Sequence, residues 1–580
     1  MSINFLPTNL KEAKQKGWNQ LDIILVTGDA YVDHPSFGAA LICRYLESHG
    51  YKVGIIPQPN WHNTTDFKAL GKPRLFFGVT AGNLDSMVAN YTSEKRKRKI
   101  DMYSEDGKPN LRPDRATIVY TNCIKQCYPD TTIILGGLEA SLRRLAHYDY
   151  WSNKFRRSLL FDSRANLIVY GMGEKTLVNI ARKIDANKPL TNIPNTAYIS
   201  REIPEKPHIE LPSYEELKED KKLYAQTSLK HAQEIAKKEP LPIVQKHQNR
   251  YLVIEPPKLV DQKTFDSIFH LPFQRQAHSQ YKKPIPAFTF VRHSVLAHRG
   301  CYGGCSFCSL GAHQGKYIVS RSEQSIIKEV TDIIAKDPTF TGTILDVGGP
   351  SANMYASTCK SKNGCERTSC LYPSICKNLD HSQKHHLKLL SKLTKLKSVK
   401  NVFINSGIRF DLALKDATYI NTLCKSHTCG QLSIAPEHTS DTVLKIMQKP
   451  EFETYKTFVD LFNKANKKYN KKQYIIPYFI AAHPGCTLED MYKLSLYLKE
   501  NHLQLKQVQS YIPLPLTLSE AMYYSGYNVF NLKKLHIPNQ EERAMQRALL
   551  QPHLKTNHRL LQKALKKLGK EKMFYKLTKY

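Results

Sequence analysis

The segment Arg299-Gly300-Cys301-Tyr302-Gly303-Gly304-Cys305-Ser306-Phe307-Cys308 holds three cysteines within eight residues, at the spacing C-x3-C-x2-C. Thiolates are the usual ligands of iron–sulfur clusters, and glycines allow a loop to fold tightly around a bulky inorganic group. Three thiolates can bind three irons of a four-iron cluster and leave the fourth iron without a protein ligand. An open metal position is typical of catalytic sites. We therefore predict a [4Fe–4S] cluster bound by Cys301, Cys305 and Cys308.

A structural zinc site is the alternative for these cysteines. His298 or His313 would then supply the fourth ligand. Zinc sites more often use C-x2-C pairs than a C-x3-C-x2-C triplet. The spacing therefore favours the iron–sulfur cluster.

The loop resembles the cluster loop of the radical S-adenosylmethionine (SAM) enzymes, C-x3-C-x-aromatic-C, with Phe307 at the aromatic position. The resemblance implies that the open iron binds the amino and carboxylate groups of SAM, and it makes Phe307 a cofactor-binding residue. It also implies reductive cleavage of SAM to methionine and a 5′-deoxyadenosyl radical, which acts on a substrate that the sequence does not identify. An electron donor such as flavodoxin or ferredoxin would be a partner.

Strand and helix patterns alternate through a predicted radical SAM core at 285–525. We predict strands over 287–292, 342–350, 401–407, 431–435, 474–481 and 507–511, and helices over 322–335 and 386–396. Six such repeats make a partial (β/α)6 barrel, whose active sites form at the carboxyl ends of the strands. The cysteine loop follows the first strand, so its position agrees with its predicted chemistry.

Two further cofactor contacts follow from the resemblance. Gly348 and Gly349 fit the glycine-rich motif that binds the methionine amino group of SAM, although Pro350 replaces the usual glutamate. The segment 436–445 is similar to the Q-S-G-S-D-x-V-L-K segment of the methylthiotransferases, which would place Glu437 near the SAM ribose or carboxylate. No residue is predicted to be a general acid or base, so the catalytic residues stay unknown.

Both similarities have plainer alternatives. A glycine pair at the end of a strand is also ordinary turn chemistry. Ser440 or Asp441 can simply cap the helix that begins at Thr442. His483-Pro484-Gly485 occupies the place of the F-P-G turn in the radical SAM family.

The first 200 residues predict a doubly wound parallel sheet. Apolar runs at 22–28, 52–56, 131–135 and 166–170 are each expected to form a buried strand, and helical sequence follows several of them. Gly136-Gly137 and Gly171-Met172-Gly173-Glu174 resemble the cobalamin-binding-type domain that precedes many radical SAM cores. The cobalt-ligating motif D-x-H-x-x-G, however, is replaced by Asp33-His34, so the spacing argues against cobalamin.

A second cysteine group lies in a predicted insertion at 351–380. Cys359, Cys365, Cys370 and Cys376 have the spacing C-x5-C-x4-C-x5-C. Four thiols in a polar loop indicate a second metal site, either an auxiliary four-iron cluster or structural zinc. The alternative is a set of free cysteines.

The rest of the chain is divided between a charged connector at 201–284 and a basic helical extension at 526–580. Over nearly its full length the sequence resembles the YgiQ-like family of radical SAM proteins. The segments 80–87, 112–120, 348–355 and 406–411 carry the resemblance.

The net charge of +34 leaves RNA open as a partner. The alternatives to a general radical SAM enzyme are therefore an RNA-modifying methyl- or methylthio-transferase and a non-catalytic iron–sulfur redox protein. Apolar runs fall short of the ~20 residues needed to span a bilayer, and residues 1–20 lack the apolar core of a secretory signal. Thirteen cysteines in a chain of this length favour a reducing compartment, so we expect a cytoplasmic protein without membrane contact.

Overall fold

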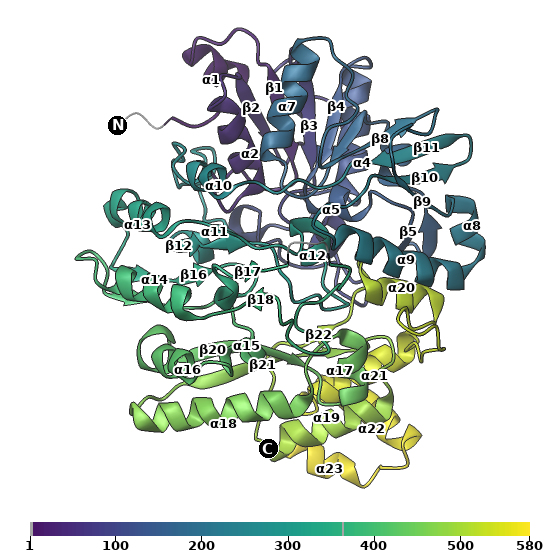
Figure 1. Cartoon of the computed structure of the whole chain (residues 1–580), viewed down its shortest axis with the longest axis vertical. Coiled ribbons are helices and arrows are strands. Elements are labelled where there is room, and N and C mark those ends of the chain that lie inside the picture. The colour runs from purple at the N-terminus through teal and green to yellow at the C-terminus, as the bar shows by residue number, and fades with distance from the viewer. Residues whose placement is uncertain (1–3, 362–364, 580) are drawn as a thin grey trace.

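The computed structural model describes residues 4–361 and 365–579. A large sheet with its helices forms the N-terminal part, drawn in purple and blue in Figure 1. A second set of parallel strands and helices follows in green, and the C-terminal helices in yellow lie beside it. No helix in these ranges is long and apolar enough to cross a membrane.

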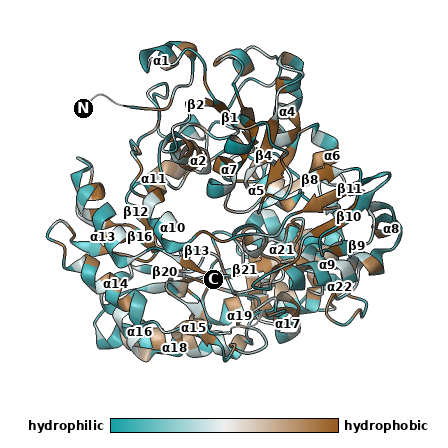
Figure 2. Ribbon diagram, turned by 45° about the horizontal axis from the view of Figure 1, so that its top comes forward, coloured by the Kyte–Doolittle hydropathy of each residue, from teal (hydrophilic) through white to brown (hydrophobic). Residues whose placement is uncertain are grey.

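The N-terminal sheet begins with five parallel strands in the order β2-β1-β3-β4-β7. These are β1 (Ile23–Thr27), β2 (Val53–Pro57), β3 (Phe76–Thr80), β4 (Ile133–Gly136) and β7 (Leu167–Val169). Helix α2 (Gly38–Glu47) connects β1 to β2, α4 (Ala116–Cys127) lies between β3 and β4, and α7 (Glu174–Asp185) follows β7. Every residue of β1 is buried, and Figure 2 shows the central strands as hydrophobic. The predicted doubly wound sheet is confirmed, and its strand order reverses between β1 and β3.

Four more strands extend the same sheet, and three of them come from the expected connector 201–284. They are β8 (Thr196–Ser200), β11 (Arg250–Ile254), β10 (Ile243–His247) and β9 (Ile209–Leu211), with antiparallel pairs from β7 to β10. Helices α8 (Tyr214–Glu219), α9 (Lys221–Ile235) and α10 (Gln262–Ile268) accompany them. Leu252, Val253 and Ile254 are buried, so this segment belongs to the sheet although prolines and charges dominate its composition. Ser213 and Glu216 form a capping box at the start of α8.

The second part is the predicted partial (β/α)6 barrel. Its strands are β12 (Ser294–Leu296), β15 (Thr343–Ile344), β16 (Asp346–Gly348), β19 (Asn401–Val402), β20 (Gln431–Glu437), β21 (Tyr474–Ala481) and β22 (Gln509–Ser510), and all their pairs are parallel. The helices include α13 (Glu323–Asp332), α14 (Lys384–Thr394), α17 (Asp441–Met447), α18 (Phe452–Lys468) and α19 (Leu488–Glu500). One apolar core joins these strands and helices, and Leu389, Phe458 and Leu494 are fully buried in it.

The first barrel strand does not lie where the sequence predicts it. Residues 286–291 form a helix, α11 (Pro286–Val291), and the strand β12 begins only at Ser294. Pro286 occupies the first turn of α11, where its fixed φ favours a helix and its missing N–H costs nothing. The prediction of a strand over 287–292 is therefore wrong, because the apolar residues of this helix mimic a strand pattern.

The C-terminal extension packs on the barrel. Helices α21 (Gln540–Leu550), α22 (His558–Lys567) and α23 (Met573–Thr578) contribute Leu549, Leu565 and Leu577 to the barrel core. On the outer side, Lys563 and Lys567 form ion pairs with Glu541. The predicted basic helical tail is thus a packed layer with a charged outer face.

A buried carboxyl group joins the two parts. Glu520 of α20 (Leu518–Ser525) accepts hydrogen bonds from the backbone N–H of Tyr148 in β5 (His147–Asp149), at 3.0 Å, and from the hydroxyl of Tyr224 in α9, at 2.8 Å. The side chain is fully buried. Burial raises the pKa of Glu520 to about 8, against an ordinary value of 4.5.

We expect this group to make stability depend on pH. Between pH 4.5 and 8 the unfolded chain ionises Glu520 while the folded chain keeps it protonated, so stability falls as pH rises, by at most about 1.4 kcal/mol per pH unit. Glu520→Gln removes this dependence and keeps an acceptor for Tyr148. The melting temperature of the variant minus that of the parent should therefore increase from pH 5 to pH 8. For the exposed control Glu453→Gln this difference should stay constant. A constant difference for Glu520→Gln would contradict the raised pKa of Glu520.

Candidate functional site

The three-cysteine loop lies between β13 (His298–Arg299) and α12 (Leu310–Gln314), directly beyond β12. Its backbone is fixed at both ends: Cys301 N–H donates to Gly315 O at 3.1 Å, and Ser306 N–H donates to Met447 O at 3.0 Å. Cys308 N–H closes the loop onto Cys305 O at 3.1 Å. The loop therefore sits at the carboxyl end of the first barrel strand, as the sequence predicts.

The three thiols lie near one another. A Cβ placed on Gly303 would be 3.3 Å from Cys301 Sγ and 3.9 Å from Cys305 Sγ, so the glycine leaves space beside both sulfurs. Burial raises the pKa of the Cys301 and Cys308 thiols, and the neighbouring thiols raise it further. Thiols held together in a half-buried loop suit a group that binds them as thiolates.

The zinc alternative finds no support in the described ranges. No three His, Cys, Asp or Glu side chains there are arranged to hold a single metal ion. His313 Nδ1 is instead 3.0 Å from Ser141 Oγ. The thiolates of a four-iron cluster each bind a different iron, so they need not converge on one point. The choice of a cluster over zinc therefore rests on the cysteine spacing and stays a prediction.

A buried arginine lies against the thiols. Arg409 Nη1 is 3.4 Å from Cys305 Sγ, and its guanidinium binds Asp411 through both oxygens, at 2.9 and 2.6 Å. Burial alone would lower the pKa of Arg409, but the charges of Asp411 and Cys305 raise it above its usual value. Arg409 is thus a fixed cation beside the sulfur donors. No role for Arg409 is predicted from the sequence, and only its place in the family-like segment 406–411 could have drawn attention to it.

Glu437 ends β20 in the same buried region. Its φ is +71°, a left-handed conformation that is uncommon for a residue with a side chain and that often marks functional sites. Lys449 Nζ lies 3.5 Å from its carboxylate and donates to Ala435 O at 2.7 Å. Burial raises the pKa of Glu437, although Lys449 opposes the shift. The Glu437 charge also contributes, as the smallest cause, to raising the pKa of the Cys308 thiol.

Phe307 and Ser306 attach the loop to the end of the barrel. The Phe307 ring meets His483 edge to face at 6.2 Å. His483 Nε2 and Ser306 Oγ are each 2.7 Å from Ser519 Oγ. His483, in the place of the F-P-G turn, is therefore a packing and hydrogen-bonding partner of the cysteine loop.

Gly348 and Gly349 lie where β16 ends. A Cβ on Gly348 would overlap Ser406 Oγ, and one on Gly349 would be 2.6 Å from His298 O and from the His298 ring. Gly349 thus requires glycine for close approach to the His298 backbone, whereas the Ser406 hydroxyl beside Gly348 can rotate away. Ser440 precedes α17 but makes no side-chain cap, while Asp441 accepts from Phe452 N–H at 2.8 Å.

Replacing Gly349 by alanine should therefore disturb the predicted SAM site. The added methyl group meets backbone that cannot rotate away, and overpacking of this kind costs roughly 1–3 kcal/mol. We expect a lower melting temperature and weaker SAM binding by calorimetry. Gly311→Ala in α12 is the matched control, since nothing lies within 4 Å of its Cβ position. Equal behaviour of the two variants would contradict the packing argument.

A cavity lies at the switch point of the N-terminal sheet, where the strand order reverses. This cavity of about 440 Å³ is lined by Gly82, Gly136 and Gly171 at strand ends and by His313 from α12. Arg299, beside the cysteine loop, donates to Glu174 at the start of α7 at 2.6 Å. The cavity therefore opens between the sheet and the cysteine loop, where ligands of such sheets bind.

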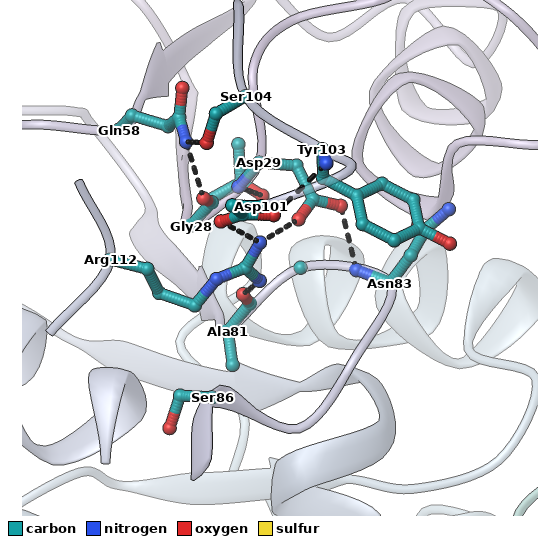
Figure 3. A network of polar contacts seen from close by, with 12 residues as sticks. Gly28, Asp29, Gln58, Ala81, Asn83, Ser86, Asp101, Tyr103, Ser104 and Arg112 are labelled. Carbon is teal, nitrogen blue, oxygen red and sulfur yellow. Dashed lines mark hydrogen bonds and ion pairs between the residues drawn. The ribbon is translucent and has the colours of Figure 1, made fainter. Parts of the chain in front are cut away.

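A polar network braces the loops at this switch point (Figure 3). Arg112 forms ion pairs with Asp29 at 2.8 Å and Asp101 at 3.3 Å, and Asp29 accepts from Asn83 N–H at 2.7 Å. Asn83 also accepts from Gly38 N–H at the start of α2. Burial raises the pKa of Asp29, and Arg112 opposes the shift. These contacts fix the ends of β1 and β3 rather than offering free groups to a ligand.

His34 does not face the cavity. Its Nδ1 accepts from Ser36 N–H at 3.1 Å, and its Nε2 lies 3.4 Å from Arg275 Nη1. The ring is fully surrounded by protein. His34 is thus not placed as a cobalt ligand, and the argument against cobalamin stays a prediction.

Comparisons with known proteins cover nearly the whole chain. Family models described as "Radical SAM N-terminal", "Radical SAM superfamily" and "Domain of unknown function (DUF3362)" match residues 5–294, 295–498 and 506–575. A UPF0313 protein of Methanocella arvoryzae is 46% identical over 96% of this chain and 94% of its own length. A UPF0313 protein of Geobacter sulfurreducens is 44% identical over 98% of this chain and 96% of its own length.

Two solved structures are more distant. The radical SAM methyltransferase TsrM from Kitasatospora setae, solved with tryptophan substrate and a SAM analogue, has a TM-score of 0.48 and 15% identity, covering 86% of this chain and 75% of that one. The cobalamin-dependent SAM radical enzyme OxsB, solved with aqua-cobalamin, has a TM-score of 0.49 and 11% identity, covering 96% and 63%.

Proposed function

Because the chain belongs to the UPF0313, or YgiQ-like, family of the radical SAM superfamily, we propose that it is an enzyme that cleaves SAM reductively and uses the resulting radical on a substrate still to be found. The observation that carries the proposal is the half-buried trio Cys301, Cys305 and Cys308 at the carboxyl end of the first barrel strand, with Arg409 against Cys305. Such a site can hold a cluster and leave one iron free for SAM.

The residues of the chain have separate tasks in this proposal. Cys301, Cys305 and Cys308 hold the cluster, and Arg409 offsets part of its negative charge. When bound, the cluster supplies the electron that splits the sulfonium of SAM into methionine and a 5′-deoxyadenosyl radical. The end of the barrel half-buries the loop, which limits the access of water to it.

SAM would be oriented by the end of the barrel strands. The carbonyl groups around Gly348 and Gly349 are proposed to receive its amino group, and Glu437 its ribose or carboxylate. Phe307 is proposed to lie beside the cofactor, since its ring adjoins the loop and His483. We assign these positions to a core at 285–525 with its insertion at 351–380.

Partners and location follow from the same chemistry. A one-electron donor such as flavodoxin or ferredoxin would reduce the cluster. All thirteen cysteines are unpaired, which favours a reducing, cytoplasmic location. We do not extend the proposal to RNA, because Lys563 and Lys567 of the basic tail are paired with Glu541.

The test is a SAM cleavage assay on protein purified without oxygen and reconstituted with iron and sulfide. With dithionite, the protein should form 5′-deoxyadenosine and methionine in equal amounts, and without reductant it should form neither. Loaded, reduced protein that leaves SAM intact would overturn the proposal.

A further inference from the structure

The second cysteine group gathers around one small cavity. Cys359 lies in β17 (Thr358–Cys359), which pairs with β18 (Leu379–Asp380), and Cys376 N–H donates to Cys370 O at 2.8 Å. Cys359, Cys365, Cys370 and Cys376 all line the same cavity. Residues distant by up to seventeen positions are thus folded around one hollow.

This cysteine group is attached directly to the first one. Cys370 N–H donates to Tyr302 O at 3.0 Å, and Ser369 Oγ donates to Gly303 O at 2.7 Å. A Cβ on Gly304 would overlap the backbone at Thr368, so the two loops touch closely at this glycine. The insertion is therefore part of the wall of the candidate site and not a separate surface loop.

The surroundings of the cavity suit a bound anionic group. The cavity has a volume of about 40 Å³, and all four thiols lie in its wall. Lys316 reaches into it, with Nζ 3.8 Å from Cys365 Sγ. One side is apolar, with Tyr302 and Leu379 buried there. Cysteines that serve only as packing residues would not need to share a cavity with a lysine side chain. The arrangement of four thiols, one cation and an apolar wall therefore favours a binding site.

We propose that Cys359, Cys365, Cys370 and Cys376 bind a second iron–sulfur cluster. Four thiolates are the full ligand set of a closed cluster. Zinc would need the four sulfurs about 2.3 Å from one point. No such convergence of three or more donors is present in the part of the chain that the structure describes. Ligands of a cluster are spread over several irons, which agrees with thiols placed around the rim of a cavity. This inference does not depend on SAM cleavage.

The test counts iron, sulfide and zinc in protein prepared without oxygen. The parent should hold roughly eight irons if both clusters have four. The variant C301A/C305A/C308A should keep the iron and sulfide of the second cluster, and C359A/C365A/C370A/C376A should keep those of the first. Cys429→Ala, at an exposed cysteine outside both groups, should change nothing.

Each outcome decides the matter. Iron and sulfide retained in the first variant, with a cluster spectrum by Mössbauer spectroscopy, would support the proposal. About one zinc per chain in that variant, or no metal in it, would overturn the proposal. If either variant does not fold, total iron in the parent decides: about four irons per chain is too few for two clusters. Failure here leaves the SAM assay of the parent unaffected, so the two proposals fail separately.

Discussion

The variant C301A/C305A/C308A should form no 5′-deoxyadenosine above the level of a reaction without protein. The three thiolates are the only protein ligands proposed for the SAM-binding cluster, and without them SAM has no iron to bind and receives no electron. The measurement is 5′-deoxyadenosine by liquid chromatography, under dithionite and with SAM in excess.

Two controls separate lost chemistry from lost folding. Cys429→Ala should keep full activity, because Cys429 is exposed and lies outside both cysteine groups. Circular dichroism of the triple variant should match the parent, since the barrel core does not include these thiols among its fully buried residues. Cleavage of SAM by a folded triple variant would disprove the assignment of the three cysteines.

Arg409→Gln should have the next largest effect. The substitution leaves the Asp411 carboxylate buried without its partner, which costs about 3–5 kcal/mol of stability. It also removes a cation 3.4 Å from Cys305 Sγ. Because a positive charge stabilises the reduced cluster, its loss should lower the reduction potential and slow SAM cleavage.

Matched variants separate these two consequences. Arg409→Lys keeps the charge and should hold the potential near that of the parent, although it loses the paired hydrogen bonds to Asp411. The double variant R409Q/D411N leaves no unpaired charge and should recover much of the melting temperature. Arg74→Gln, at a half-exposed ion pair, should change neither quantity. An unchanged potential in Arg409→Gln would show that the arginine serves packing alone.

The sequence was a sufficient guide wherever one local pattern dominates. The buried run Ile23–Thr27 and the strand Tyr474–Ala481 lie where their apolar residues predict them. The cysteine loop could also be predicted, because the glycines and thiols of a cluster loop are contiguous in the chain. It lies at the end of a strand, as expected. In contrast, Pro286 turned an apolar stretch into α11, and the charged composition of 201–284 concealed three sheet strands.

The site itself was only half predictable. Arg409 reaches Cys305 from a segment about a hundred positions away, and Lys449 reaches Glu437 across α17. Spacing cannot reveal such contacts, because they arise only when the barrel brings strand ends together. The closeness of the two cysteine groups is of the same kind, since it depends on Gly304 meeting the backbone of Thr368.

Three thiolates are proposed to leave one iron of the first cluster open to SAM. Electron paramagnetic resonance of the reduced protein, recorded before and after SAM is added, reports on this open iron. SAM should change the g-values of the cluster signal in the parent and in C359A/C365A/C370A/C376A, where only the first cluster remains. A fully loaded cluster whose spectrum is identical with and without SAM would contradict it and would leave a redox protein without SAM chemistry.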